Sequence, residues 1–292
     1  MMSRLPIGFN RNPGAWRGIN ARNPVTGGFP MRNAMALVDD PSRLHTTGRE
    51  RYAIPTYNQV GSTCGGEGSC NALETAWRAA LGDTIVRQVV THVLGEPQEW
   101  QFDGYKAYML ARRRFYDDQD VNAGLYINEA WQALIDEGIL PPGSRIDVLP
   151  DDWDAINHSL AHGKPTICAI AVDEGDLNAN GENGQIDEET VTEGWLAGHC
   201  EAVLNLLVQT GTLFVQDQGS WGREYAWHGL ILRSAKRVQL AMVDHFHTLE
   251  LPEGWERWEG LHELIVPMRE PPLESDDDGS VGSIQPPEIP HE

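Results

Sequence analysis

The sequence predicts an α+β fold, in which a helical half is followed by a half built from antiparallel strands. Apolar residues recur at helical spacing in several segments between residues 64 and 162. From residue 165 onward, the apolar segments are runs of strand length bounded by glycines and polar turns. This order is typical of an α+β architecture, and a functional site is expected in a cleft between the two halves.

The first predicted helix begins at Cys64, after a Gly-containing turn. Its buried stripe is formed by apolar residues at helical spacing, namely Leu73, Trp77, Ala80 and Leu81. Further helices are expected at residues 85–93, at 103–117, from Ile127 to a stop at Gly138, and at 152–162. Strands are expected at Pro165–Val172, Cys200–Val208, Thr212–Asp217, His228–Arg233 and Arg237–Val243.

The two ends of the chain differ in composition from its middle. Residues 1–38 contain five arginines and no acidic residue, so we interpret residues 1–44 as an extended basic arm. The favoured interpretation places this arm on the chain's own acidic body; the alternatives are docking on an acidic protein partner and occlusion of the cleft. Residues 45–245 are expected to form the main domain, 246–269 an extension packed on it, and 270–292 an acidic, Pro-rich tail that a partner could hold.

Composition excludes several classes of function. A net charge of −21 argues against nucleic acid or an anionic membrane as the main partner. Four irregularly spaced cysteines fit neither a zinc site nor a disulfide framework, and no cofactor is expected. No apolar run has the length of a membrane span, and no signal-peptide core is evident. A cytoplasmic, non-secreted protein in a reducing compartment is expected, and a virion component would have the same features.

The segment from Gln59 to Cys64 has the residue types that a cysteine nucleophile needs. Cys64 is expected at a helix N-terminus, where unpaired backbone N–H groups and the helix dipole favour a thiolate. The side chain of Gln59 can donate an N–H group to an oxyanion that forms beside the sulfur. A buried, structural Cys64 is the alternative interpretation. The other cysteines, Cys70, Cys168 and Cys200, are expected to pack in the core.

A base and a carboxylate follow in the strand half. His199 lies at the start of an apolar strand, and Asp217 ends the next one. Together with Cys64 they can form a Cys–His–Asp relay, in which the third group orients the imidazole. Gln218 is an alternative orienting group, and Asp217 could instead serve as a loop cap.

These residues, in this order, resemble the papain-like cysteine peptidases, specifically divergent bacterial and phage forms. The resemblance covers about residues 45–240 and depends on Gln59 to Cys64, Gly198-His199, and the Ser220-Trp221-Gly222 turn. It implies a two-lobed fold with the active site in the cleft. Cys64 would be the nucleophile, His199 the base and Asp217 the orienting residue, with Gln59 and the Cys64 N–H forming the oxyanion hole. The positions implied for substrate binding are Gly65, Gly66, Gly198 and Trp221.

The sequence departs from the family pattern at several positions. The spacing from Gln59 to Cys64 is one residue shorter than is common, and Gly65-Gly66 replace a Trp-Ala pair. Asp217 stands where Asn is usual, with two extra residues before Ser220. The predicted function is hydrolysis of peptide or isopeptide bonds. The alternatives are an inactive papain-like fold that acts as a structural or binding component, for example in a phage particle, and acyl transfer by the same residues.

A polar loop before the second predicted strand contains a weak calcium-binding pattern. Oxygen-bearing side chains recur at the spacing of a calcium loop, with glycine at the sixth position. A plain acidic surface loop is the favoured interpretation, because the last ligand is Asp and no clear helix precedes the segment. The residues that would bind the ion are Asp176, Asn178, Asn180 and Asp187.

Overall fold

The computed structural model describes residues 29–44, 49–53, 59, 62–121, 123–173, 176, 185–186, 197–220 and 229–268. Its α-helices are α1 (Ala34–Asp39), α2 (Cys64–Leu81), α3 (Asp83–Leu94), α4 (Gly104–Tyr116), α5 (Glu129–Asp136), α6 (Trp153–Ala161) and α8 (Ala235–Ala241). Its strands are β1 (Trp100–Phe102), β2 (Arg145–Val148), β3 (Thr166–Val172), β4 (Gln185–Ile186), β5 (Ala197–Gln209), β6 (Thr212–Gln218), β7 (Leu230–Ser234), β8 (His247–Glu250) and β9 (Ile265–Pro267). Short 3₁₀ helices lie at Pro41–Arg43, Arg49–Tyr52, Trp255–Arg257 and Glu259–Leu264.

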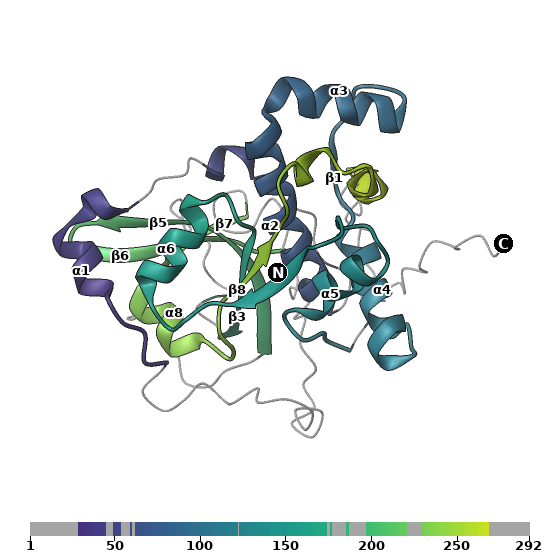
Figure 1. Ribbon diagram of the computed structural model, residues 1–292. Helices are drawn as coiled ribbons and strands as arrows, with labels where there is room; N and C mark the ends of the chain where they lie inside the picture. Colours follow the sequence, from purple (N-terminus) through teal and green to yellow (C-terminus); the bar gives the residue numbers. More distant parts are fainter. Residues whose placement is uncertain are drawn as a thin grey trace, which may run out of the picture.

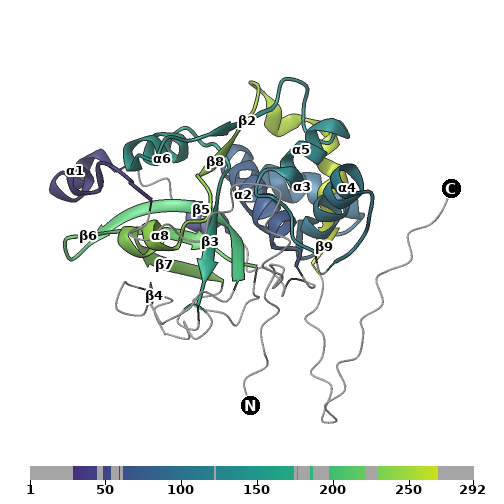
Figure 2. The same cartoon turned by 90° about the horizontal axis from the view of Figure 1, so that it is seen from below.

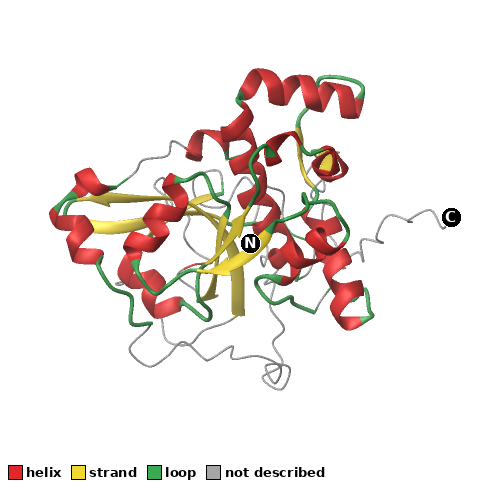
Figure 3. Cartoon of the chain, in the orientation of Figure 1, coloured by secondary structure: helices red, strands yellow, loops and turns green. Residues whose placement is uncertain are grey.

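The central element is a seven-stranded sheet with the strand order β2-β8-β3-β5-β6-β7-β4. Strands are drawn in yellow in Figure 3. Neighbouring strands are antiparallel, except that β4 runs parallel to β7. A separate two-stranded sheet pairs β1 with β9. The combination of helices with an antiparallel sheet confirms the predicted α+β class at this level.

Two hydrophobic clusters cover opposite faces of the sheet. Helix α2 packs on one face, with α3, α4 and α5 packed around it, and α1, α6 and α8 lie around the other face (Figures 1 and 2). Strand β5 shows the alternation that this layering requires. Cys200, Ala202 and Leu204 belong to the cluster under α2, whereas Val203 belongs to the opposite cluster. Within the described ranges, no helix is both long enough and apolar enough to span a bilayer.

Glycines let neighbouring elements approach the start of α2 closely. A Cβ atom added at Gly66 would lie 2.2 Å from the backbone oxygen of Gly104 in α4. A Cβ atom added at Gly68 would lie 2.8 Å from the backbone oxygen of Cys200 in β5. The absence of side chains at these positions therefore sets how closely α2 packs on both the helical layer and the sheet.

Substituting Gly66 with Ala is expected to lower the free energy of unfolding by about 3 kcal/mol, since the methyl group would collide with backbone. Without the clash, Gly→Ala inside a helix would stabilise by about 1 kcal/mol. Gly65→Ala is the matched control, because its methyl group would meet the side chain of Leu125, with the nearest atom at 3.0 Å. Urea unfolding of both variants tests this expectation. Equal stability of the two would contradict it.

The structure corrects one predicted strand. Residues 237–243 were expected to form a strand, but residues 235–241 form α8. The side chain of Ser234 accepts a hydrogen bond from the backbone N–H of Arg237, which caps this helix at its N-terminus. Val238 and Ala241 are buried one turn apart, so the same apolar residues satisfy helical periodicity.

Both ends of the main domain also differ from the prediction. Residues 29–44 are not extended throughout, because they contain α1, whose Leu37 is fully buried in the cluster with α6 and α8. Strand β8 lies inside the sheet between β2 and β3, so residues 247–250 are part of the domain rather than an extension packed on it. Residues 1–28 and the tail from residue 269 lie outside the described residues.

Candidate active site

Cys64 is the first residue of α2, as the sequence predicted, and only 1% of it is exposed. Its sulfur is hydrogen-bonded by three backbone N–H groups, those of Cys64, Gly65 and Cys200. Two of these donors belong to the first turn of α2, where N–H groups have no partner within the helix. The third comes from β5, so the sulfur lies where the helix meets the strand.

The thiol of Cys64 is nevertheless protonated in this arrangement. Burial raises the pKa of Cys64 to about 12, and the charge of Glu201 adds to the effect. The three N–H groups act in the opposite direction but are outweighed. The expectation of a thiolate at the helix N-terminus therefore does not hold for the buried state, although the N–H groups that would stabilise one are present.

His199 lies near the start of β5, opposite Ile170 of β3, and is fully buried. Burial, followed by the charge of Arg233, lowers the pKa of His199 to about 3, so the imidazole is neutral. The peptide between His199 and Cys200 supplies the N–H group that contacts the Cys64 sulfur. The structure thus brings the strand at His199 to the start of α2, with a neutral thiol and a neutral imidazole.

Gln59 joins the segment before Cys64 to the turn after β6. Its backbone N–H donates to the backbone carbonyl oxygen of Ser220 at 2.8 Å, and the Ser220 hydroxyl donates to Gln59 Oε1 at 2.6 Å. Both residues are buried. Because Oε1 accepts from Ser220, the amide N–H groups of Gln59 are directed away from that residue. This fixed orientation is what an oxyanion donor requires.

The structure does not bring Asp217 to His199. Both carboxylate oxygens of Asp217 accept hydrogen bonds from Arg233 Nη1, at 2.7 Å each. The reason lies in the strand register: Asp217 is opposite Val203 in the β5–β6 ladder, four residues along β5 from His199. Among the described residues, the carboxyl group that lies beside the neutral imidazole of His199 is that of Glu201, whose Oε1 is 3.8 Å from Nε2.

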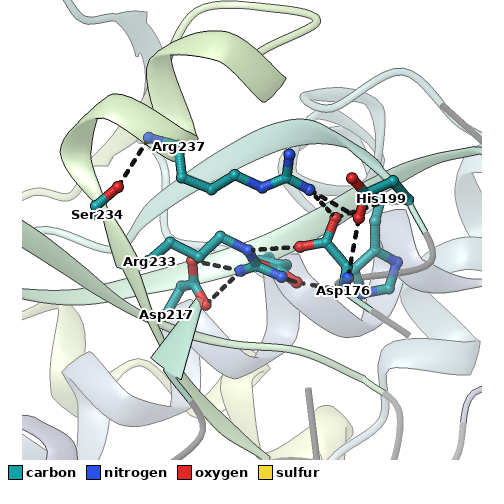
Figure 4. Close-up of polar contacts among 8 residues, drawn as sticks. Asp176, His199, Asp217, Arg233, Ser234 and Arg237 are labelled. Atoms are coloured by element: carbon teal, nitrogen blue, oxygen red, sulfur yellow. Dashed lines mark hydrogen bonds and ion pairs between the residues drawn. The ribbon is translucent and has the colours of Figure 1, made fainter. Parts of the chain in front are cut away.

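Arg233 belongs to a fully buried ionic cluster that the sequence did not predict (Figure 4). It contacts Glu201 and Asp217, and its Nε lies 3.2 Å from Asp176 Oδ1. A second guanidinium, that of Arg237, contacts Asp176 and Asp173. The sequence signal that could have indicated the cluster is a glutamate inside an otherwise apolar strand, since such a residue is buried only when it is paired.

Three of the glycines predicted to bind substrate lie in packed surroundings. Gly65 faces Leu125, and Gly66 faces α4. Gly198 is buried opposite Ala171 in the β3–β5 ladder. Their packing accounts for small residues at these positions, and their role in substrate binding stays a prediction. Trp221, the fourth predicted position, lies outside the described residues.

The calcium-loop prediction falls mostly outside the described residues, since Asn178, Asn180 and Asp187 are not among them. Asp176 is described, and its two carboxylate oxygens contact Arg233 and Arg237. These cations occupy the oxygens that a calcium ion would need. No group of three His, Cys, Asp or Glu side chains in the described part of the chain is arranged to hold a metal ion.

Neither a protein-family model nor a curated protein matches this sequence. Solved structures do match it, and one of them is the digestive procathepsin L 3 of the Tenebrio molitor larval midgut. The two chains are 12% identical and have a TM-score of 0.47, and the match covers 69% of this chain and 68% of that one. A likeness at this level does not define an activity, which has to be inferred from the chain's own residues.

Proposed function

We propose that this chain is a papain-like cysteine peptidase that hydrolyses peptide or isopeptide bonds. The observation that supports this most strongly is the surroundings of the Cys64 sulfur. Backbone N–H groups of the first turn of α2 and of Cys200, the residue after His199, all hydrogen-bond to it. A thiol that meets a row of N–H donors and the strand that carries His199 would suit a cysteine nucleophile, which supports the proposal.

In the proposed reaction, His199 acts as the base and then as the acid. It accepts the Cys64 proton while the sulfur forms a bond to the substrate carbonyl carbon, and the resulting oxyanion is held by the Cys64 N–H and the Gln59 amide. His199 then gives the proton to the leaving amine as the C–N bond breaks. Water hydrolyses the remaining thioester. Because both groups begin neutral, proton transfer accompanies attack instead of preceding it.

The described structure corresponds to a closed form of this site. Cys64 is 1% exposed and His199 is 0% exposed, so a peptide cannot reach either group without movement of the surrounding chain. Opening would also admit water. Since burial is the largest cause of both pKa shifts, opening lowers the pKa of Cys64 and raises that of His199, which brings the two values closer together.

A peptide-derived epoxide that alkylates thiols tests the proposal, with mass spectrometry to identify the labelled cysteine. Labelling is expected at Cys64, and His199→Ala is expected to slow it by roughly 10²–10⁴-fold, because the base is lost. Cys64→Ala should abolish hydrolysis of peptide substrates. Cys70→Ala is the matched control, since Cys70 is a fully buried cysteine on the same helix. Labelling that does not depend on His199 would contradict the assignment.

A second candidate function is a binding module that retains this fold without catalysis. The burial of Cys64, together with its raised pKa, specifically favours it, because both suppress nucleophilic reactivity. In that case Cys64 reacts no faster than an ordinary buried thiol, and the epoxide does not distinguish it from Cys70. The same experiment therefore decides between the two functions.

We further propose that the chain acts in a reducing, non-secreted compartment on a protein or peptide. All four cysteines are free thiols, and all four are buried. This fits a location where disulfides are not formed. The net charge of −21 would favour substrates of basic character through long-range attraction.

A further inference from the structure

His199 and Glu201 lie two residues apart on β5, so their side chains are on the same face of the strand. Both are fully buried, and His199 Nε2 lies 3.8 Å from Glu201 Oε1. This separation is within ion-pair range and about 1 Å longer than a hydrogen bond. A small side-chain rotation therefore suffices to bring the two atoms into hydrogen-bond contact.

The segment that follows β6 leaves room for this contact. A Cβ atom added at Gly219 would lie 3.5 Å from Glu201 Oε1 and 3.8 Å from His199 Nε2, so both atoms face the same point. Because residue 219 is glycine, no side chain from this residue occupies that point, which the side chain of Ile231 also approaches at 3.5 Å. If the family motif is aligned on Ser220, Gly219 also stands at the position of its usual Asn, where this chain offers no orienting group.

Arg233 holds the Glu201 carboxylate in place. Its Nη1 contacts Oε2, and its Nη2 lies 3.1 Å from Oε1. Arg233 is held in turn by Asp217 and Asp176. Oε1 thus lies between the guanidinium and the imidazole, in a position fixed by a network of fully buried charges.

We propose that Glu201, rather than Asp217, is the residue that positions His199. Its Oε1 accepts a hydrogen bond from the Nε2–H group of His199. Nδ1 is then the ring nitrogen that takes the proton from Cys64. This inference rests on the proposed function and names a positioning residue for the same site. It assigns Asp217 the separate task of holding Arg233, on which the placement of Glu201 depends.

The charge state of the cluster is compatible with this role. Burial raises the pKa of Glu201 well above its usual range and also raises that of Asp217, while the charge of Arg233 acts in the opposite direction. A protonated carboxyl group still has an oxygen lone pair for Nε2–H. Glu201 can therefore fix the tautomer of His199 whether or not it is ionised.

The tautomer of His199 is the measurement that tests the proposal. In the full chain labelled with ¹⁵N-histidine, the ring nitrogens are assigned by comparison with His199→Gln, and the wild type is expected to carry its proton on Nε2. Glu201→Gln is expected to move that proton to Nδ1. The single amide oxygen of the new side chain stays on Arg233, so its NH₂ group faces Nε2 and donates to it.

Asp217→Asn is the matched control, since it also changes a carboxylate that contacts Arg233 into an amide. It is expected to leave the tautomer unchanged. With the base misplaced, labelling of Cys64 by the epoxide should fall about 10²-fold or more in Glu201→Gln, and less in Asp217→Asn. If the ring proton of His199 moves to Nδ1 equally in both variants, Glu201 acts only through Arg233 and the proposal is overturned.

The outcomes separate this proposal from the proposed function. The expected tautomer change without epoxide labelling of Cys64 would support the positioning role and reject the peptidase. Epoxide labelling that is His199-dependent and equally fast in wild type and Glu201→Gln would support the peptidase and reject the positioning role. If Glu201→Gln does not fold, the wild-type spectrum still decides, because a proton on Nδ1 overturns the proposal.

Discussion

Replacing Arg233 with Met is expected to lower the free energy of unfolding by about 5 kcal/mol. Breaking a single buried ion pair typically costs about 3–5 kcal/mol, because the remaining charge is buried without compensation. Arg233 contacts three carboxylates, those of Asp176, Glu201 and Asp217, and all of these side chains are fully buried. The expected loss approaches the whole stability of many domains.

Urea unfolding at several pH values measures this loss, which is expected to grow as pH rises. At low pH the carboxyl groups of Glu201 and Asp217, whose pKa values are raised by burial, can take up protons, and the missing cation matters less. At higher pH they must ionise in the interior or the domain unfolds. Arg145→Met is the control, because Arg145 pairs with Asp147 at an exposed position and should contribute little to stability. A small, pH-independent loss for Arg233→Met would contradict the expectation.

The pH dependence of stability should contain a second large contribution, from His199. The folded pKa of His199 is about 3, against an ordinary value of 6.5, so the unfolded chain takes up a proton first as pH falls. The stability contributed by the neutral imidazole is full above about pH 6.5 and is lost as pH falls to about 3. The shift corresponds to roughly 4–5 kcal/mol over this window.

Comparing wild type with His199→Gln isolates this contribution. The acidic carboxyl groups act in the opposite direction, because the raised pKa values of Glu201 and Asp217 favour the folded state at low pH. The wild type and His199→Gln share this effect, so it largely cancels when the free energy of unfolding of one is subtracted from that of the other. That difference in the free energy of unfolding should narrow or reverse as pH falls from 6.5. For Cys200→Ala, which changes the adjacent residue, the free energy of unfolding should depend on pH in the same way as that of the wild type. The same pH dependence for His199→Gln and wild type would contradict the prediction.

Local patterns in the sequence were sufficient for most of the fold. The apolar stripes of α2 to α6 have helical spacing. Strand β3 is a largely apolar run, and β5 and β6 are apolar runs of strand length with polar residues among them. The segment of α8 was misassigned because its apolar residues fit either periodicity, and the deciding interaction is the Ser234 cap. Strands β1, β2, β8 and β9 were missed because each has at most four residues and is stabilised by a distant partner.

In the candidate site too, local features could be predicted from the sequence and long-range partners could not. The helix that begins at Cys64 and the strand that contains His199 could be predicted, because a Gly-containing turn precedes the first and an apolar run follows His199. The catalytic roles of the two residues stay predictions. The partner of Asp217 could not be identified, because it depends on which residues of β5 and β6 stand opposite each other. The pKa of Cys64 also depends on burial, which raises it by more than the N–H groups at the helix N-terminus lower it. Burial depends on the packing of distant segments, so it could not be predicted from the sequence around Cys64.

The position of β8 has a consequence for how the chain acquires its structure during synthesis. Residues 247–250 lie between β2 and β3, so the strand neighbouring β3 on that side emerges from the ribosome some 80 residues after β3 itself. Until then β2 has no partner in the sheet, and that part of the edge of β3 lacks its hydrogen bonds. Such late, long-range pairing slows folding. A nascent chain that already contains Cys64, His199 and Arg233 is therefore still without a complete sheet until residues 247–250 have emerged.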